Sequence, residues 1–250
     1  MITIKGLVIR EKTVGESSKT IVVLSEELGI INVFIRGGAK SKKNVSATQL
    51  FSYSNLCIDA KNDAYGQANY YLNSSEPINI FYNLRLDPRK TALGCYFSEL
   101  LCFSRIENSS LGEIMKLTLN TLYFLDRGEH DIELLKSIFE FRLLCEMGFR
   151  PYLVGCNKCY VCETDRMHYN FKSGLLECDD CCYNPESIYD IILDKDMLYI
   201  VRYIALTDFD KLFNFRINEK YQKKLTEFTE RFVKYNFKDY IDTLDFYRLL

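Results

Sequence analysis

The sequence has no long hydrophobic run, and its first residues lack the pattern of a secretory leader. Its longest apolar stretches, such as residues 30–35, are far shorter than the roughly 20 residues that a membrane-spanning helix requires. Residues 1–5, Met-Ile-Thr-Ile-Lys, do not begin a basic region followed by an apolar core and a cleavage site. We therefore expect a cytoplasmic protein that does not associate with a membrane.

The sequence is also poor in histidine, with only His130 and His168. Neither lies near a nucleophile motif such as GxSxG, and the carboxylates are dispersed along predicted helices, as on solvated faces. A histidine-based catalytic triad therefore has few possible members. We expect a protein that is not an enzyme and has no small-molecule substrate.

A large net charge is absent, since the formal charge is -2. The charge is nevertheless uneven, because residues 1–45 carry eight Lys or Arg and four Glu, a net +4, which leaves -6 for the rest. This polarity would allow an anionic ligand on the N-terminal part and a different partner elsewhere. A length of 250 residues with 48% hydrophobic residues favours two or three small domains.

The first 76 residues contain short apolar bursts that are typical of β-strands. Five strands over about 75 residues suit a small closed barrel, of which the OB-fold is the commonest nucleic-acid-binding form. The predicted strands span residues 2–9, 20–24, 30–35, 50–58 and 70–72.

Beyond Pro88 the apolar period changes from two residues to about 3.6, which predicts helices. Asn108-Ser109-Ser110 and Asp131 are candidate N-caps, and Gly148 and Pro151 are candidate stop signals. The predicted fold is α+β and multidomain: a five-stranded OB-fold barrel, then a helical domain with an inserted zinc finger. The predicted parts are the barrel at 1–80, helical segments at 81–152 and 186–250, and the finger at 153–185. Helices are expected over 196–206, 219–235 and 238–250.

Six of the ten cysteines lie within the 27 positions from Cys156 to Cys182. In a reducing cytosol this crowding favours a metal site over disulfides. Two CxxC pairs separated by fifteen to eighteen residues have zinc-ribbon spacing, and the intervening residues are too polar for a core. The second pair is Cys178 and Cys181, whereas Cys159 can pair with either Cys156 or Cys162. Because thiolates outnumber the ligands required, we expect His168 to be a surface residue of the finger loop.

A basic loop, residues 36–44, follows the third predicted strand and carries four cations within eight residues. Its glycines allow close approach of a ligand, and the cations would attract phosphates, although a solvated hairpin loop is the alternative. It lacks the spacing of a P-loop. Phe34, Phe51 and Tyr53 are candidate stacking residues if they do not lie in the core. The candidate nucleic-acid-binding residues are Arg10, Lys12, Lys19, Arg36, Lys40, Lys42 and Lys43.

Three segments together resemble the RecO family of bacterial recombination mediator and DNA repair proteins. They are Lys5-Gly6-Leu7-Val8-Ile9-Arg10, Gly37-Gly38-Ala39-Lys40-Ser41-Lys42, and Glu146-Met147-Gly148-Phe149-Arg150-Pro151-Tyr152-Leu153 leading into Cys156. Each motif is loose, but their order, spacing and the chain length are specific. The resemblance covers nearly the whole chain.

The resemblance implies DNA binding on the barrel, single-stranded and double-stranded, and binding to RecR and to the C-terminal tail of single-stranded DNA-binding protein. It implies loading of recombinase on coated strands, strand annealing and a nucleoid-associated protein of the bacterial cytoplasm. The chain departs from the family pattern because Tyr160 follows Cys159 and Glu163 follows Cys162. We take Cys156, Cys159, Cys178 and Cys181 as structural Zn²⁺ ligands, with Cys162 as the alternate.

Two other functions remain open from the sequence. One is a zinc-stabilised protein-protein adaptor that does not bind DNA directly. The other is a zinc-dependent hydrolase acting on nucleic acid, which would need a metal position open to water.

Overall fold

A computed structural model describes residues 1–37, 44–62, 65, 68–103, 111–182, 190–237 and 241–250. The chain forms two compact units, one of Met1–Arg127 with Ile241–Leu250 and the other of Gly128–Tyr240. Within the described ranges, no helix is both long enough and apolar enough to cross a membrane.

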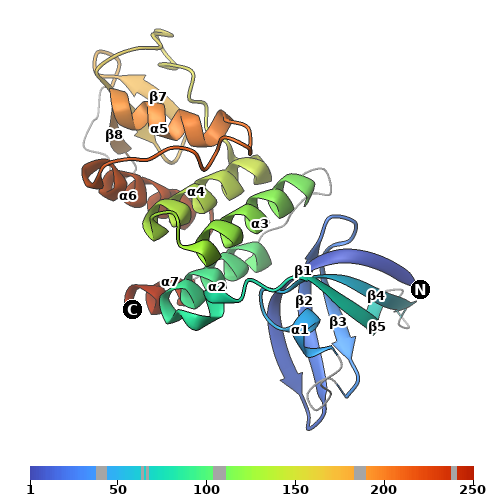
Figure 1. The fold of residues 1–250 in the computed structure, drawn as a ribbon. Helices are drawn as coiled ribbons and strands as arrows, with labels where there is room; N and C mark the ends of the chain where they lie inside the picture. The colour runs from blue at the N-terminus through green and yellow to red at the C-terminus, as the bar shows by residue number, and fades with distance from the viewer. Residues whose placement is uncertain (38–43, 63–64, 66–67, 104–110, 183–189, 238–240) are drawn as a thin grey trace. The chain divides into compact units, whose positions relative to one another are not determined.

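The first unit begins with a closed barrel of five strands in the order β1-β2-β3-β5-β4 (Figure 1). The neighbours pair antiparallel, except for β3 and β5, which pair parallel. Alternate residues of each strand point inward, and the barrel core is made of aliphatic side chains such as Val8, Ile21, Val33 and Leu56. The strands are β1 (Ile2–Val14), β2 (Ser18–Ser25), β3 (Gly29–Ile35), β4 (Tyr53–Asn62) and β5 (Ala68–Asn79).

The prediction of a five-stranded barrel is confirmed, but the fourth strand begins later than expected. The predicted strand 50–58 starts at Tyr53, because Phe51 adopts a left-handed conformation with φ 63°. The short helix α1 (Val45–Thr48) precedes this turn. Phe51 is only 1% exposed, and a Cβ on Gly94 would lie 2.8 Å from its ring. Phe51 is therefore a core residue that packs on a helix, which was the alternative to a stacking role.

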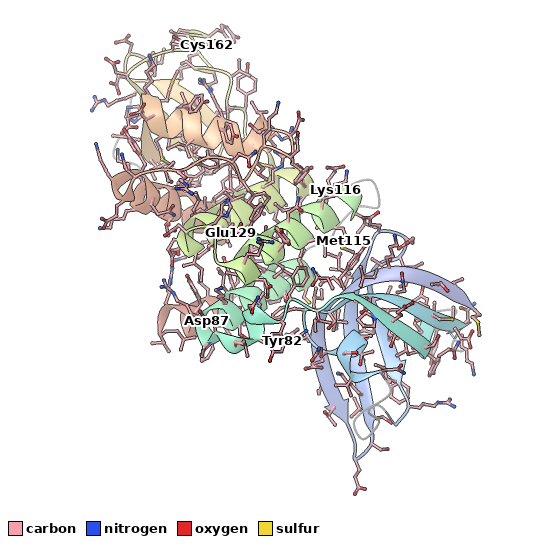
Figure 2. The ribbon with its side chains drawn as sticks, in the orientation of Figure 1. Tyr82, Asp87, Met115, Lys116, Glu129 and Cys162 are labelled. Atoms are coloured by element: carbon pink, nitrogen blue, oxygen red, sulfur yellow. The ribbon has the colours of Figure 1, made fainter. Side chains whose placement is uncertain are left out.

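Helices complete the first unit. A short 3-10 turn (Asn83–Leu86) leads from the barrel into α2 (Pro88–Phe103), past Tyr82 and Asp87, which are labelled in Figure 2. Next along the chain is α3 (Leu111–Arg127), and α7 (Asp242–Arg248) returns from the far end of the sequence to pack against α2. The backbone N–H of Thr243 donates to the Glu99 carboxylate at 3.1 Å, which fixes the start of α7.

The second unit is built around α4 (Ile132–Leu144), in which every residue from Leu134 onward is buried. Its predicted N-cap is confirmed, because the Asp131 carboxylate accepts the Leu134 N–H at 2.9 Å. The helix ends in a wide turn (Cys145–Phe149), where Gly148 has φ 93°. The other candidate cap, Asn108-Ser109-Ser110, lies outside the described residues.

A small sheet in the order β7-β6-β8 packs with the helices of the second unit (Figure 1). Tyr169 of β6 and Phe171, which directly follows β6, lie against Phe228 and Phe232 of α6, with ring centroids 5.1–6.5 Å apart among these four residues. The cysteine segment therefore shares an aromatic core with the helices. The elements are β6 (Arg166–Asn170), β7 (Leu175–Cys178), β8 (Asp190–Asp194), α5 (Lys195–Leu206) and α6 (Glu219–Asn236).

The predicted helices 196–206 and 219–235 match α5 and α6 to within one residue at either end. The predicted helix 238–250 is shorter, and its first three positions lie outside the described residues. The predicted domain limits at residues 80, 152 and 185 stay predictions.

Candidate metal centre and nucleic-acid surface

Four thiols gather at one point in the second unit. The sulfur atoms of Cys156, Cys159, Cys178 and Cys181 all lie within 4.8 Å of one another. Converging sulfur ligands in this number suit a tetrahedral metal ion. The residues present could therefore hold a metal.

Backbone hydrogen bonds shape the two loops that supply these thiols. In the first loop the Cys156 N–H donates to Val161 O and the Tyr160 N–H donates to Cys156 O, both at 2.9 Å. Tyr160 has φ 62°, which turns the chain sharply after Cys159. In the second loop the N–H groups of Cys181 and Cys182 both donate to Cys178 O at 3.0 Å. Each loop thus folds its two cysteines toward the same side.

The electrostatics of the cluster also suit a cation. Burial alone would raise the pKa of Cys156, but backbone N–H groups of Cys159, Cys178 and Lys158 lower it to about 6. Hydrogen bonds with the thiols of Cys178 and Cys159 raise the pKa of Cys181 to about 12. One thiolate therefore forms readily, and a cation at the centre of the cluster would favour ionisation of the other thiols.

His168 is buried, although the sequence predicted it on the surface. It lies on β6 with 5% of its surface exposed, and its Nε2 is 2.7 Å from Asp179 Oδ1. The prediction of a surface loop residue is wrong, because His168 belongs to the central strand of the small sheet and its side chain is buried. Hydrogen bonds from His168 and Arg166 lower the pKa of Asp179, so an ionised carboxylate joins β6 to the second cysteine loop.

Cys162 lies apart from the four-thiol cluster. Its side chain is exposed on an outer loop of the second unit (Figure 2), and its Sγ faces Tyr160 O at 3.4 Å. The structure thus brings together the four cysteines that were chosen as ligands from the sequence, and it leaves the alternate ligand, Cys162, outside the cluster. The assignment of these four as metal ligands stays a prediction.

The outer face of the barrel carries the other candidate site. The strand register places Lys12 opposite Thr20, Thr20 opposite Phe34, and Phe34 opposite Tyr71, which forms one row across four strands. Side chains that pair across neighbouring strands share a face of the sheet. Arg10, opposite Val22, lies on the same outer face because β1 has a bulge between Val8 and Arg10.

Tyr71 is the centre of a group of cations and aromatic rings. The Arg36 guanidinium carbon and the Lys61 Nζ lie 5.6 Å and 5.5 Å from the centroid of its ring. The ring of Phe34 meets it edge to face at 5.9 Å. The one acid in register with Tyr71, Asp59, pairs with the N-terminal ammonium at 3.3 Å. We name Phe34, Arg36, Lys61 and Tyr71 the Tyr71 cluster.

The other basic residues predicted to bind nucleic acid differ in exposure. Arg10 and Lys12 are exposed, whereas the side chain of Lys19 is only 14% exposed, pairs with Glu11 and donates to Thr48 O at 2.9 Å. Lys19 therefore already has internal partners. Lys40, Lys42 and Lys43 lie outside the described residues.

Tyr53 is half-buried and borders on acidic side chains. Burial raises the pKa of its phenol, and the charges of Glu26 and Glu27 raise it further. A negative environment does not favour a DNA strand at Tyr53.

The two halves of the chain match two models of one protein family. The model described as "Recombination protein O N terminal" matches residues 1–81, and "Recombination protein O C terminal" matches residues 85–243. The chain belongs to the RecO family. The family's role is in DNA repair and recombination, as the names of its curated members indicate.

Relatives with the same name align over almost their full length. The DNA repair protein RecO of Acetivibrio thermocellus is 29% identical over 248 residues, which covers 96% of each chain. The protein of that name from Caldicellulosiruptor bescii is 28% identical over 252 residues, covering 100% of this chain and 99% of its own. That from Alkaliphilus metalliredigens is 25% identical over 234 residues, 93% and 92% of the two chains.

Sequence reasoning missed two members of the Tyr71 cluster of this RecO chain. Lys61 and Tyr71 lie 25 and 35 residues after Arg36 in sequence, but the pairing of β5 with both β3 and β4 brings them beside Arg36. Strand alternation could have placed both on the outer face. The parallel contact of β3 with β5, which joins them to Phe34, has no local sequence signal.

Proposed function

We propose that this RecO chain is a non-enzymatic recombination mediator that binds single-stranded DNA on the outer face of its barrel. In this proposal it anneals complementary strands and helps to load recombinase on DNA coated by single-stranded DNA-binding protein. The Tyr71 cluster is the observation that carries the proposal, because it places two exposed cations beside two half-buried aromatic rings on one face of the barrel.

The cluster suits a single strand for a physical reason. Phosphates attract Arg36 and Lys61, while the rings of Phe34 and Tyr71 offer surfaces on which unpaired bases can stack. Arg10 and Lys12 extend the positive surface across β1 in the same register. Annealing needs no covalent chemistry: neutralised phosphates lower the repulsion between two strands, and base pairing provides the free energy.

The partners in this proposal are those that the family resemblance implies. They are single-stranded and double-stranded DNA, RecR, and the C-terminal tail of single-stranded DNA-binding protein. We place the protein in the bacterial cytoplasm, associated with the nucleoid.

We further propose that the four-thiol cluster holds one structural Zn²⁺. Zinc prefers four-coordinate tetrahedral sites, and four cysteines leave no position for a reactive water. The cluster joins loops that flank β6 and β7, so the metal would stabilise the small sheet.

The DNA-binding surface is tested by removing its charge. Replacement of Arg10, Lys12, Arg36 and Lys61 by Ala should weaken binding to an oligothymidine. It should also flatten the plot of log affinity against log salt by about two to three units, since each lost phosphate contact contributes about 0.7. Fluorescence anisotropy at several salt concentrations measures both.

The control removes equal charge elsewhere. Lys211, Arg216, Lys223 and Lys234 are exposed in the second unit, and their replacement by Ala should leave the slope unchanged. An unchanged slope in the barrel variant would refute the proposed surface. Equal flattening in both variants would show that the interaction depends on overall charge alone.

A further inference from the structure

The loop that carries the first three cysteines folds back on itself. A Cβ on Gly155 would lie 2.7 Å from Val161 O and 3.2 Å from Cys162 Cα, so these backbones are in contact. The Cys156 N–H donates to Val161 O at the same place. The backbone of Cys162 therefore lies beside that of Cys156, although only Cys156 contributes its thiol to the cluster.

The loop sequence by itself does not account for this choice. Cys159 forms a CxxC pair with Cys156 and an equally spaced pair with Cys162. Both pairs have a spacing that zinc sites use. A contact from outside the loop must therefore favour one pair.

Arg202 of α5 makes such a contact. Its guanidinium donates to three backbone oxygens: Nε to Leu153 O at 2.7 Å, and one terminal nitrogen to Val154 O at 2.8 Å and to Cys162 O at 3.2 Å. These oxygens lie on both sides of the first cysteine pair. Because the guanidinium is planar and its donors are fixed relative to one another, it holds both segments in one arrangement.

We propose that Arg202 is a positioning residue that selects the metal ligands: by holding the Cys162 carbonyl, it keeps the fifth thiol out of the cluster. This inference rests on the metal centre proposed above. The anchored carbonyl leaves the Cys162 side chain exposed and facing Tyr160 O. Without Arg202, Cys162 is free to pair with Cys159 and replace Cys156.

The test uses the full chain loaded with Zn²⁺ and has two measurements. Zinc affinity is measured by competition with a chromogenic chelator, and the exposure of each thiol by iodoacetamide labelling and mass spectrometry. In the native chain we expect about one zinc, a reactive Cys162 and protection of the four cluster thiols. Cys156→Ser should weaken zinc binding at least about tenfold and leave Cys162 reactive, since Arg202 still holds it.

The decisive variant adds Arg202→Ala to Cys156→Ser. The second substitution should restore zinc affinity at least in part and should protect Cys162 from iodoacetamide. If Arg202 merely stabilised the fold, its replacement would instead lower the zinc affinity of the Cys156→Ser chain further. Arg216→Ala, which removes an exposed arginine of the same unit, is the matched control and should restore neither property.

Arg202→Lys provides a second variant in case the alanine variant unfolds. Lysine retains the charge but lacks the planar guanidinium, so it cannot hold the three backbone oxygens in one arrangement. Arg202→Lys should therefore also restore part of the zinc affinity of the Cys156→Ser chain. If Cys162 stays reactive and zinc affinity stays low in a folded Arg202 variant, ligand selection by Arg202 is refuted. If the native chain binds no zinc and its cluster thiols are all labelled, the metal centre fails, and this inference fails with it.

Discussion

The ammonium group of Lys136 lies inside the helical core of the second unit with only 1% of the side chain exposed. It is 2.9 Å from Glu140 and 2.8 Å from Glu230, and Glu140 also accepts the Thr229 hydroxyl at 2.6 Å. Burial alone would lower the pKa of Lys136, but the two glutamates raise it. The lysine therefore stays charged, and the network joins α4 to α6.

Removing one partner of this network should be costly. Lys136→Met leaves Glu140 buried without its counterion, which we expect to lower the free energy of unfolding by about 3–5 kcal/mol. Urea denaturation measures this change. Lys223→Met, which breaks an exposed pair with Glu219, should cost far less, because solvent screens that pair. Equal effects of the two substitutions would show that burial of the network contributes nothing.

Individual residues differ in how well the sequence predicts them. The four clustered cysteines follow from the spacing of two CxxC pairs, which is a local property. The burial of His168 could not be predicted, because it depends on the central position of β6 in the small sheet, and the contact of Phe51 with Gly94 of α2 has no local signal either. The exclusion of Cys162 depends on Arg202, forty residues later in the chain.

At the scale of single elements, the junction of β8 and α5 depends on Asp194. Its carboxylate caps α5 by accepting the Met197 N–H at 3.0 Å and also pairs with Lys224 of α6. Burial opposes ionisation of Asp194, but the Lys224 and Met197 hydrogen bonds hold its pKa below the usual value of an aspartate. The ionised form is therefore favoured by folding.

This lowered pKa predicts a pH dependence of stability. The contribution of the Asp194 charge is fully present above the unfolded pKa and is lost as the pH falls through the folded pKa. Asp194→Asn keeps a capping oxygen but removes the charge, so it should cost about 0.5–1 kcal/mol at pH 7 and progressively less as the pH falls through the lowered pKa of Asp194. Thermal unfolding across this pH range measures the difference. A deficit of the variant that persists in acid would contradict this account.

Strands and helices were largely predictable because their signals are local. Apolar alternation located five strands, and Asp131 located the start of α4. The packing of the last helix was not predictable in this way, because α7 packs on α2 and not on the preceding α6. No local pattern in residues 242–248 indicates a partner about 150 positions earlier.

For the whole molecule, the route of the chain decides how the proposed function can be tested. The first unit is discontinuous, because the final residues return to it after the second unit. A chain cut after residue 80 would lose α2, against which Phe51 packs, and would expose this core residue. DNA-binding experiments should therefore use the full chain with point substitutions.

Binding of single-stranded DNA by the Tyr71 cluster is the central claim, and photo-crosslinking tests it most directly. An oligothymidine that carries 5-iodouracil is irradiated with the full chain, and mass spectrometry identifies the crosslinked residues. Aromatic rings that stack on bases should react, so we predict crosslinks at Phe34 and Tyr71 and none at Tyr53, which borders Glu26 and Glu27. Crosslinks confined to the Gly128–Tyr240 unit, with none in β3 or β5, would contradict the claim.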